Sequence, residues 1–94
     1  MYTNIEQIRQ EIDKIDKKIV SLLGKRSDLV LNAAQFKKDI KSVKAEDRIK
    51  SMLSKRREWA VENNISPDLI EGMYKMLVNY FVNEELKHWK KTKF

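Results

Sequence analysis

The sequence has no cysteine, one histidine, one proline and two glycines. The lack of cysteine excludes disulfides, thiolate metal ligands and a thiol nucleophile, and a single histidine excludes any site that needs two imidazoles. So few turn-forming residues argue against a strand-rich fold, which needs a turn about every 8–12 residues. No apolar run approaches the roughly 18 residues of a membrane span, and the N-terminus lacks the apolar segment of a signal peptide. We therefore expect a cytoplasmic protein that does not associate with membranes.

The 94 residues are rich in charge, with 20 Lys and Arg, 14 Asp and Glu, and a net charge of +6. This excess favours an anionic partner, which includes nucleic acid as well as small carboxylates and phosphates. The cationic runs at 37–44, 55–57 and 87–93 come without any recognised nucleic-acid-binding motif. We interpret these runs as solvated faces and expect no nucleic-acid partner, with a basic nucleic-acid-binding helical protein as the distant alternative.

Apolar residues recur at spacings of three and four along the first half of the chain, a pattern that predicts a helix. The stripe comprises Ile5, Ile8, Ile12, Ile15, Ile19, Leu22, Leu29, Ala33, Phe36 and Ile40. It predicts one helix from about residue 5 to residue 41, with Asn4 as the N-cap. Gly24 lies inside this helix, and an interior glycine weakens a helix by about 1 kcal/mol without ending it.

Two shorter helices complete the expected all-α fold of one long, one short and one medium helix. The second is predicted over about 45–62, and the third begins at Ser66-Pro67, an N-cap followed by proline at the first helical position. Both are too short to cover a first helix of about 54 Å. A second copy of the long helix could bury the apolar stripe that they leave exposed, so we predict an intertwined homodimeric helical bundle. The alternative is a monomeric three-helix bundle in which the first helix breaks at Gly24.

Charged residues interrupt the stripes where apolar residues are expected. Arg26 occupies a stripe position, and Lys37 would return to within about 20° of it, about 16 Å further along a continuous helix. Arg9 is rotated by about 100° from Arg26, toward a neighbouring helix. Glu85 interrupts the stripe of the third helix. Buried charges must be paired or face a ligand, so these residues predict a pocket for a small polycarboxylate, with Glu85 as an ordinary counter-ion as the alternative. Arg26 also argues against a simple coiled-coil scaffold.

Several segments resemble the all-helical chorismate mutases. The first-helix matches are Ile8-Arg9, Ile12-Asp13, Ile15-Asp16, Leu23-Gly24-Lys25-Arg26 and Phe36-Lys37. The segments 47–49, 57–64, 70–74 and 84–89 are most similar to the isochorismate-pyruvate lyase branch of that family. The resemblance covers nearly the whole chain, and it implies a chorismate mutase-like helical domain over 1–94, an intertwined homodimer with two identical sites, a small dicarboxylate substrate, and no cofactor or metal.

The same resemblance implies roles for individual residues. Arg9 would complete the site of the partner protomer, Arg26 would bind a substrate carboxylate, and Arg48 would lie near the site. Lys37 would contact a carboxylate or the ether oxygen of the substrate. Lys37 and Glu85 are thus the expected catalytic pair.

Three positions depart from the usual mutase pattern. Glu85 stands where the family usually has Gln, so it would help only in its protonated form, which burial favours. Ile49 and Val82 are apolar where bacterial mutases place a carboxylate and a hydroxyl-bearing residue, as in the lyase branch, and they would line the substrate pocket. We expect chorismate mutase activity, which gives prephenate, with isochorismate-pyruvate lyase, which gives salicylate and pyruvate, as a close second. The pathway, aromatic amino-acid or salicylate biosynthesis, is left open.

Overall fold

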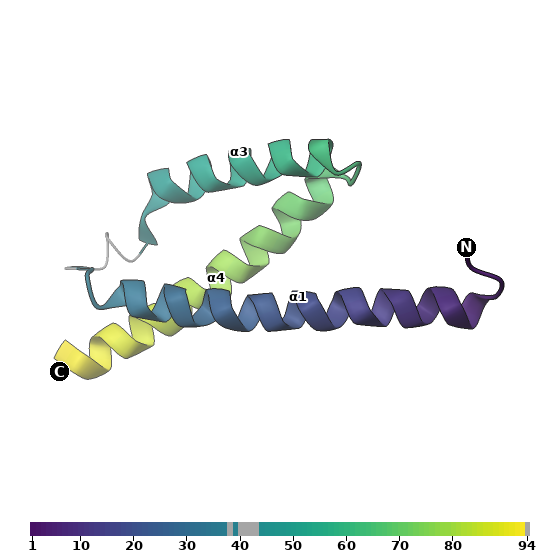
Figure 1. Ribbon diagram of the computed structural model, residues 1–94. Coiled ribbons are helices and arrows are strands. Elements are labelled where there is room, and N and C mark those ends of the chain that lie inside the picture. Colours follow the sequence, from purple (N-terminus) through teal and green to yellow (C-terminus); the bar gives the residue numbers. More distant parts are fainter. Residues whose placement is uncertain (38, 40–43, 94) are drawn as a thin grey trace. The chain divides into compact units, whose positions relative to one another are not determined.

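The computed structural model describes residues 1–37, 39 and 44–93, with side chains up to Lys87. This part of the chain contains three α-helices and no strand: α1 (Ile5–Ala34), α3 (Glu46–Glu62) and α4 (Pro67–Lys93) (Figure 1). The all-helical expectation is confirmed. None of the described helices is long and apolar enough to cross a membrane. The chain divides into two units, 1–32 and 33–94, so that most of α1 lies in the first unit and its last two residues belong to the second.

Local capping starts α1 where the sequence predicts. The Asn4 carboxamide oxygen accepts the Gln7 amide N–H at 3.0 Å. In return, the Gln7 carboxamide oxygen accepts the Thr3 amide N–H at 2.7 Å. These bonds satisfy amide groups that have no partner within the helix. The helix then passes through Gly24 without a break, so the alternative of a helix broken at that glycine is wrong.

The predicted end of the first helix is wrong by about seven residues, because α1 ends at Ala34 and not near residue 41. The amides of Phe36 and Lys37 bond to carbonyls three residues back, those of Ala33 and Ala34, at 3.1 Å each, which closes a tight turn in place of the α-helical ladder. The apolar spacing continues past this turn, but Phe36 is 79% exposed and does not extend a buried face. Ile40, the last position of the predicted stripe, lies outside the described residues.

This early end also corrects the helical-wheel argument for the candidate site. Lys37 is not helical, so it does not share a face of one continuous helix with Arg26. Its position is set by the turn after Ala34 and by its own contact with α4.

The second unit is built around the helical hairpin of α3 and α4 (Figure 1). The bounds of α3 and the start of α4 agree with the sequence prediction. Asn64 takes a left-handed conformation (φ 57°), and the next amide, that of Ile65, bonds to the Ala60 carbonyl at 3.0 Å, which closes the end of α3. The Ser66 hydroxyl accepts the Leu69 amide N–H at 3.2 Å, as expected for an N-cap. The buried apolar side chains of α3 are Met52, Leu53 and Ala60.

Candidate functional site

A part-buried polar contact of the second unit joins Lys37 to Glu85. The Lys37 ammonium donates to the Glu85 carboxylate across 2.7 Å. The Glu85 side chain is 4% exposed and that of Lys37 is 25% exposed. A charge-assisted hydrogen bond in such a water-poor place is stronger than its surface equivalent. The two residues are 48 positions apart, so the fold brings together the pair that the resemblance marks as catalytic. The contact is also the counter-ion arrangement that the sequence left as the alternative.

Two neighbouring elements hold this pair in place. Lys37 follows directly on the turn that ends α1, where its amide bonds to the Ala34 carbonyl at 3.1 Å. Glu85 lies on α4, one turn after Val82, which is half-buried. Because residues three apart share a helix face, Val82 and Glu85 lie on the same side of α4. An ammonium has three N–H donors and the bond to Glu85 uses one, so Lys37 can also donate to an incoming anion.

Arg48 and Ile49 lie in the first turns of α3. Ile49 is half-buried, and its amide donates to the Ala45 carbonyl at 3.0 Å. Arg48 is exposed and lines an open hollow of about 400 Å³ on α3, which also contains Lys55 and Arg56. Glu58 also lines it and pairs with Lys55, so Arg48 and Arg56 give the hollow a net positive charge that suits an anion. The approach of Arg48 and Ile49 to a bound substrate stays a prediction.

The two remaining predicted residues, Arg9 and Arg26, belong to the first unit. Arg9 donates to Glu6 across 2.8 Å, with side-chain exposures of 63% and 68%. Such a surface pair is worth about 0–1 kcal/mol, so Arg9 can exchange it for another carboxylate at little cost. Arg26 is half-buried on the same helix. Their assembly with Lys37 and Glu85 in one pocket stays a prediction.

A cation–aromatic cluster on the α3–α4 hairpin was missed by the sequence interpretation of residues 55–57 as a solvated cationic run. The Arg56 guanidinium carbon lies 4.7 Å from the centroid of the Trp59 ring and 5.4 Å from that of Tyr74. Distances below about 6 Å give a favourable cation–π attraction. The spacing of Arg56 and Trp59, three residues on one helix, is a signal in the sequence, but the partner on α4 is not.

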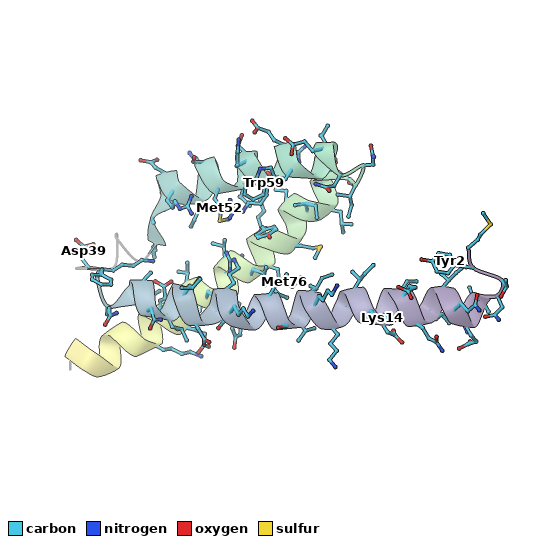
Figure 2. All side chains as sticks on the ribbon, in the orientation of Figure 1. Tyr2, Lys14, Asp39, Met52, Trp59 and Met76 are labelled. Carbon is cyan, nitrogen blue, oxygen red and sulfur yellow. The ribbon has the colours of Figure 1, made fainter. Side chains whose placement is uncertain are left out.

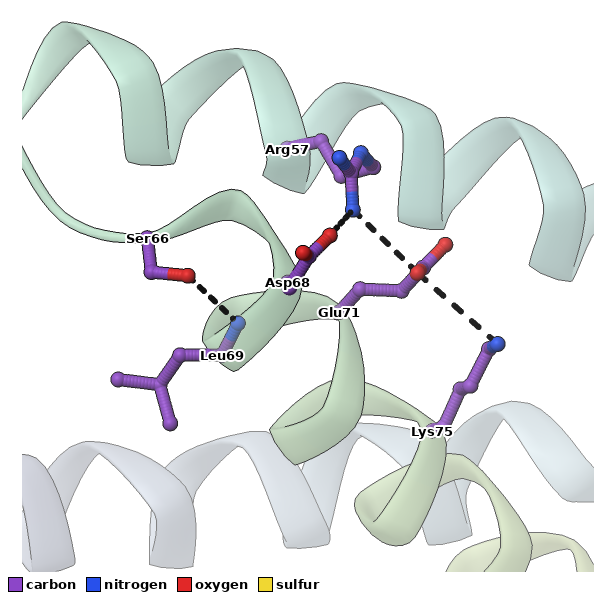
Figure 3. Close-up of polar contacts among 6 residues, drawn as sticks. All are labelled: Arg57, Ser66, Asp68, Leu69, Glu71 and Lys75. Atoms are coloured by element: carbon purple, nitrogen blue, oxygen red, sulfur yellow. Dashed lines mark hydrogen bonds and ion pairs between the residues drawn. The ribbon is translucent and has the colours of Figure 1, made fainter.

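Arg57, the next residue, ties α3 to the start of α4 (Figure 3). Its guanidinium donates to Asp68 at 2.9 Å and to Glu71 at 3.3 Å. Lys75 adds a longer ion pair of 3.9 Å to Glu71. The hydrogen bond to Asp68 is the main reason why the pKa of Arg57 is raised, with further contributions from the charge of Asp68 and from Glu71. This cluster links α3 to the first two turns of α4. Within the described residues no group of three or more His, Cys, Asp or Glu side chains is placed to hold a metal ion.

Comparisons with known proteins indicate the family of this chain. Residues 8–86 match the family model described as chorismate mutase type II. Isochorismate pyruvate lyase of Pseudomonas aeruginosa is 35% identical over 91 residues, which cover 97% of this chain and 90% of that protein.

Two longer proteins are similar as well. A bifunctional chorismate mutase/prephenate dehydratase of Buchnera aphidicola subsp. Schizaphis graminum is 35% identical over 80 residues, or 84% of this chain and 21% of that protein. The T-protein of Enterobacter agglomerans is 32% identical over 79 residues, or 83% of this chain and 21% of that protein. The match thus covers about a fifth of each of these two proteins, and nearly the whole of the Pseudomonas protein.

Proposed function

Because this chain belongs to the chorismate mutase type II family, we propose that it is a chorismate mutase, an enzyme that rearranges chorismate to prephenate. The observation that carries the proposal is the part-buried pair of Lys37 and Glu85, 2.7 Å apart. It offers a cation beside a carboxyl group in a water-poor place, where an ether oxygen of the substrate would gain negative charge.

The rearrangement breaks the ether C–O bond and forms a C–C bond within one molecule. It therefore needs no nucleophile and no external reductant, and the protein contributes orientation and electrostatic stabilisation. Lys37 donates a hydrogen bond to the ether oxygen as the C–O bond lengthens. By analogy with oxyanion-hole donors, such a contact supplies roughly 10²–10³ in rate.

Glu85 takes part in this step in its protonated form. A carboxylate would repel the ether oxygen, whereas a carboxylic acid donates a hydrogen bond to it. In the free protein the Lys37 ammonium neutralises the Glu85 carboxylate across 2.7 Å. When the substrate is bound, the ammonium turns toward it, and the neutral acid form of Glu85 leaves no buried negative charge uncompensated.

Arg26 and Arg9 bind the two carboxylates of the substrate, with Arg9 supplied by a second protomer. Guanidinium groups suit this task because they bind carboxylates through two parallel hydrogen bonds. The homodimer is supported by the apolar stripe of α1, which is open in the single chain: Ile5 is 57%, Ile12 50% and Ile15 58% exposed. A continuous exposed apolar face of this kind marks a protein interface.

Isochorismate-pyruvate lyase is the second candidate. It is favoured by the Pseudomonas relative of that name, which matches 97% of this chain. Apolar Ile49 and Val82 agree with that branch. The lyase reaction breaks the same C–O bond while a ring hydrogen moves to the leaving enolpyruvyl group, so pyruvate departs and salicylate remains. Lys37 and Glu85 would serve both reactions at the same oxygen.

Separate incubations with chorismate and isochorismate decide between the two. Chromatographic detection of prephenate from chorismate supports the mutase, and salicylate with pyruvate from isochorismate supports the lyase. Lys37→Ala should abolish most of either activity. Lys50→Ala, at an exposed lysine of α3 outside the hollow that contains Arg48, is the matched control and should retain it. Formation of neither product by the folded protein would contradict the catalytic proposal.

A further inference from the structure

Arg56 lies where two hollows of the α3–α4 hairpin meet, and neither hollow is lined by Lys37 or Glu85. The first has a volume of about 220 Å³ and is walled by Trp59, Ile65, Ile70 and Tyr74. The second is the cationic hollow of about 400 Å³ on α3, and it shares Arg56 and Trp59 with the first. Trp59 is labelled on α3 in Figure 2. The Arg56 guanidinium thus lies between an apolar hollow and a cationic hollow.

The electrostatics of Arg56 differ from those of its neighbours. Lys55 pairs with Glu58, and Arg57 pairs with Asp68 and Glu71. In the described part of the chain, no carboxylate pairs with Arg56, and its buried Nε atom has no hydrogen-bond partner. The rings of Trp59 and Tyr74 hold its guanidinium at 4.7 and 5.4 Å. A guanidinium held in this way is oriented for a carboxylate but has none.

We propose that this end of the hairpin is a second small-molecule site, which takes a one-ring aromatic monocarboxylate. The ring would enter the apolar hollow between Ile65, Ile70 and the two aromatic side chains, and the carboxylate would bond to Arg56. The volume of about 220 Å³ lies below the roughly 300–1,000 Å³ of sites for drug-sized ligands, so the hollow suits a group of about one ring.

Charge narrows the ligand class further. The adjoining hollow is lined by Arg48 and by the ion pair of Lys55 with Glu58, so its net charge is positive and a ligand that carries an ammonium group beside its carboxylate is repelled. A plain aromatic acid such as benzoate should therefore bind better than phenylalanine. Salicylate belongs to the same chemical class, but the site rests on its own geometry and not on either candidate reaction.

Titration of the ¹⁵N-labelled full chain with benzoate tests the site by NMR. Saturable shifts are expected at the Trp59 indole and at the amides of Asn63, Ile65 and Ile70, with benzoate up to about 10 mM, which exceeds the millimolar Kd expected of a one-ring ligand. Arg56→Gln should weaken binding at least about tenfold, because the charged hydrogen bonds are lost.

Three comparisons complete the experiment. Lys50→Gln removes an exposed cation of the same helix outside both hollows and should leave the Kd unchanged. Phenylalanine should bind more weakly than benzoate. Arg56→Lys keeps the positive charge but lacks the planar set of guanidinium N–H donors, so it should weaken binding severalfold. This variant tests the role of Arg56 where Arg56→Gln does not fold. Absence of saturable shifts at the hairpin, equal affinity of either Arg56 variant and the parent, or a preference for phenylalanine would overturn the proposal.

Discussion

The Lys37 ammonium lies 2.7 Å from the Glu85 carboxylate, whose side chain is 4% exposed. Neither residue is a neighbour of the other in sequence, and each is costly to bury alone. Their pairing explains how a glutamate is accommodated on the buried side of α4. The two charges also stabilise each other, so removal of either charge should raise the energetic cost of burying the other.

Lys37→Ala should destabilise the protein by about 3 kcal/mol, since it leaves a buried carboxylate without its partner. This value is the lower end of the range for buried pairs because Lys37 is 25% exposed. Glu85→Gln in the Lys37→Ala background should restore part of the loss, because the amide carries no charge. Urea unfolding of the two variants measures both effects. Lys50→Ala is the control, and equal midpoints for it and Lys37→Ala would contradict the prediction.

Activity should fall as pH rises if Glu85 works as an acid, because deprotonation replaces a hydrogen-bond donor by a repelling charge at the ether oxygen. Glu85→Gln keeps a donor at every pH, so its kcat should be nearly independent of pH where the parent loses activity. Steady-state kinetics with chorismate between about pH 5 and 9 would show the difference. A parent profile as flat as that of Glu85→Gln would exclude the protonated-glutamate step.

Arg57→Ala should lower the unfolding midpoint, because it removes the bonds that tie α3 to Asp68 and Glu71 of α4. Lys55→Ala is the matched control: it breaks only an exposed pair within α3, with Glu58, and should have a smaller effect. Thermal unfolding of both variants shows which substitution lowers the unfolding midpoint more. A larger effect of Lys55→Ala would show that the hairpin does not depend on Arg57.

The contribution of Arg57 should not vary with pH in the neutral range. Its pKa is raised in the folded protein, mainly by the hydrogen bond to Asp68. The stabilisation is therefore complete below the unfolded-state pKa of arginine and is lost only as pH rises through the higher folded-state value. The difference in midpoint between Arg57→Ala and the parent should be the same at pH 7 and pH 9. A difference that shrinks over this interval would contradict the assignment.

A homodimer should have twice the mass of the 11.2 kDa chain in light scattering. Ile12→Asp places a carboxylate in the exposed apolar stripe of α1 and should shift the protein toward monomer at micromolar concentration. Lys14→Asp puts the same group on the polar face, where Lys14 pairs with Glu11, and should leave the mass unchanged. A parent protein that elutes as an 11.2 kDa monomer would also refute the role of Arg9 in a second protomer's site.

The sequence alone determined the helical class, the start of α1 and the two ends of the turn between α3 and α4. Asn4, Asn64 and Ser66 act on backbone groups within a few residues of themselves, so their effects can be read without the rest of the fold. The family resemblance likewise follows from the linear order of residues, and residues 8–86 match the corresponding family model.

Only the tertiary structure decided where α1 ends and which charges meet. The apolar spacing continues past Ala34 to Phe36, so periodicity gives no sign of the turn there. The sequence marked Lys37 and Glu85 separately, but their bond spans 48 positions. In the same way, the sequence suggests that Arg56 and Arg57 belong to one solvated cationic run. In the structure, Arg56 contacts the Tyr74 ring of α4 and Arg57 bonds to Asp68 of α4. The physical reason is that the partner and burial of a charge are set by the element that packs against it, and periodicity within one helix does not contain that information.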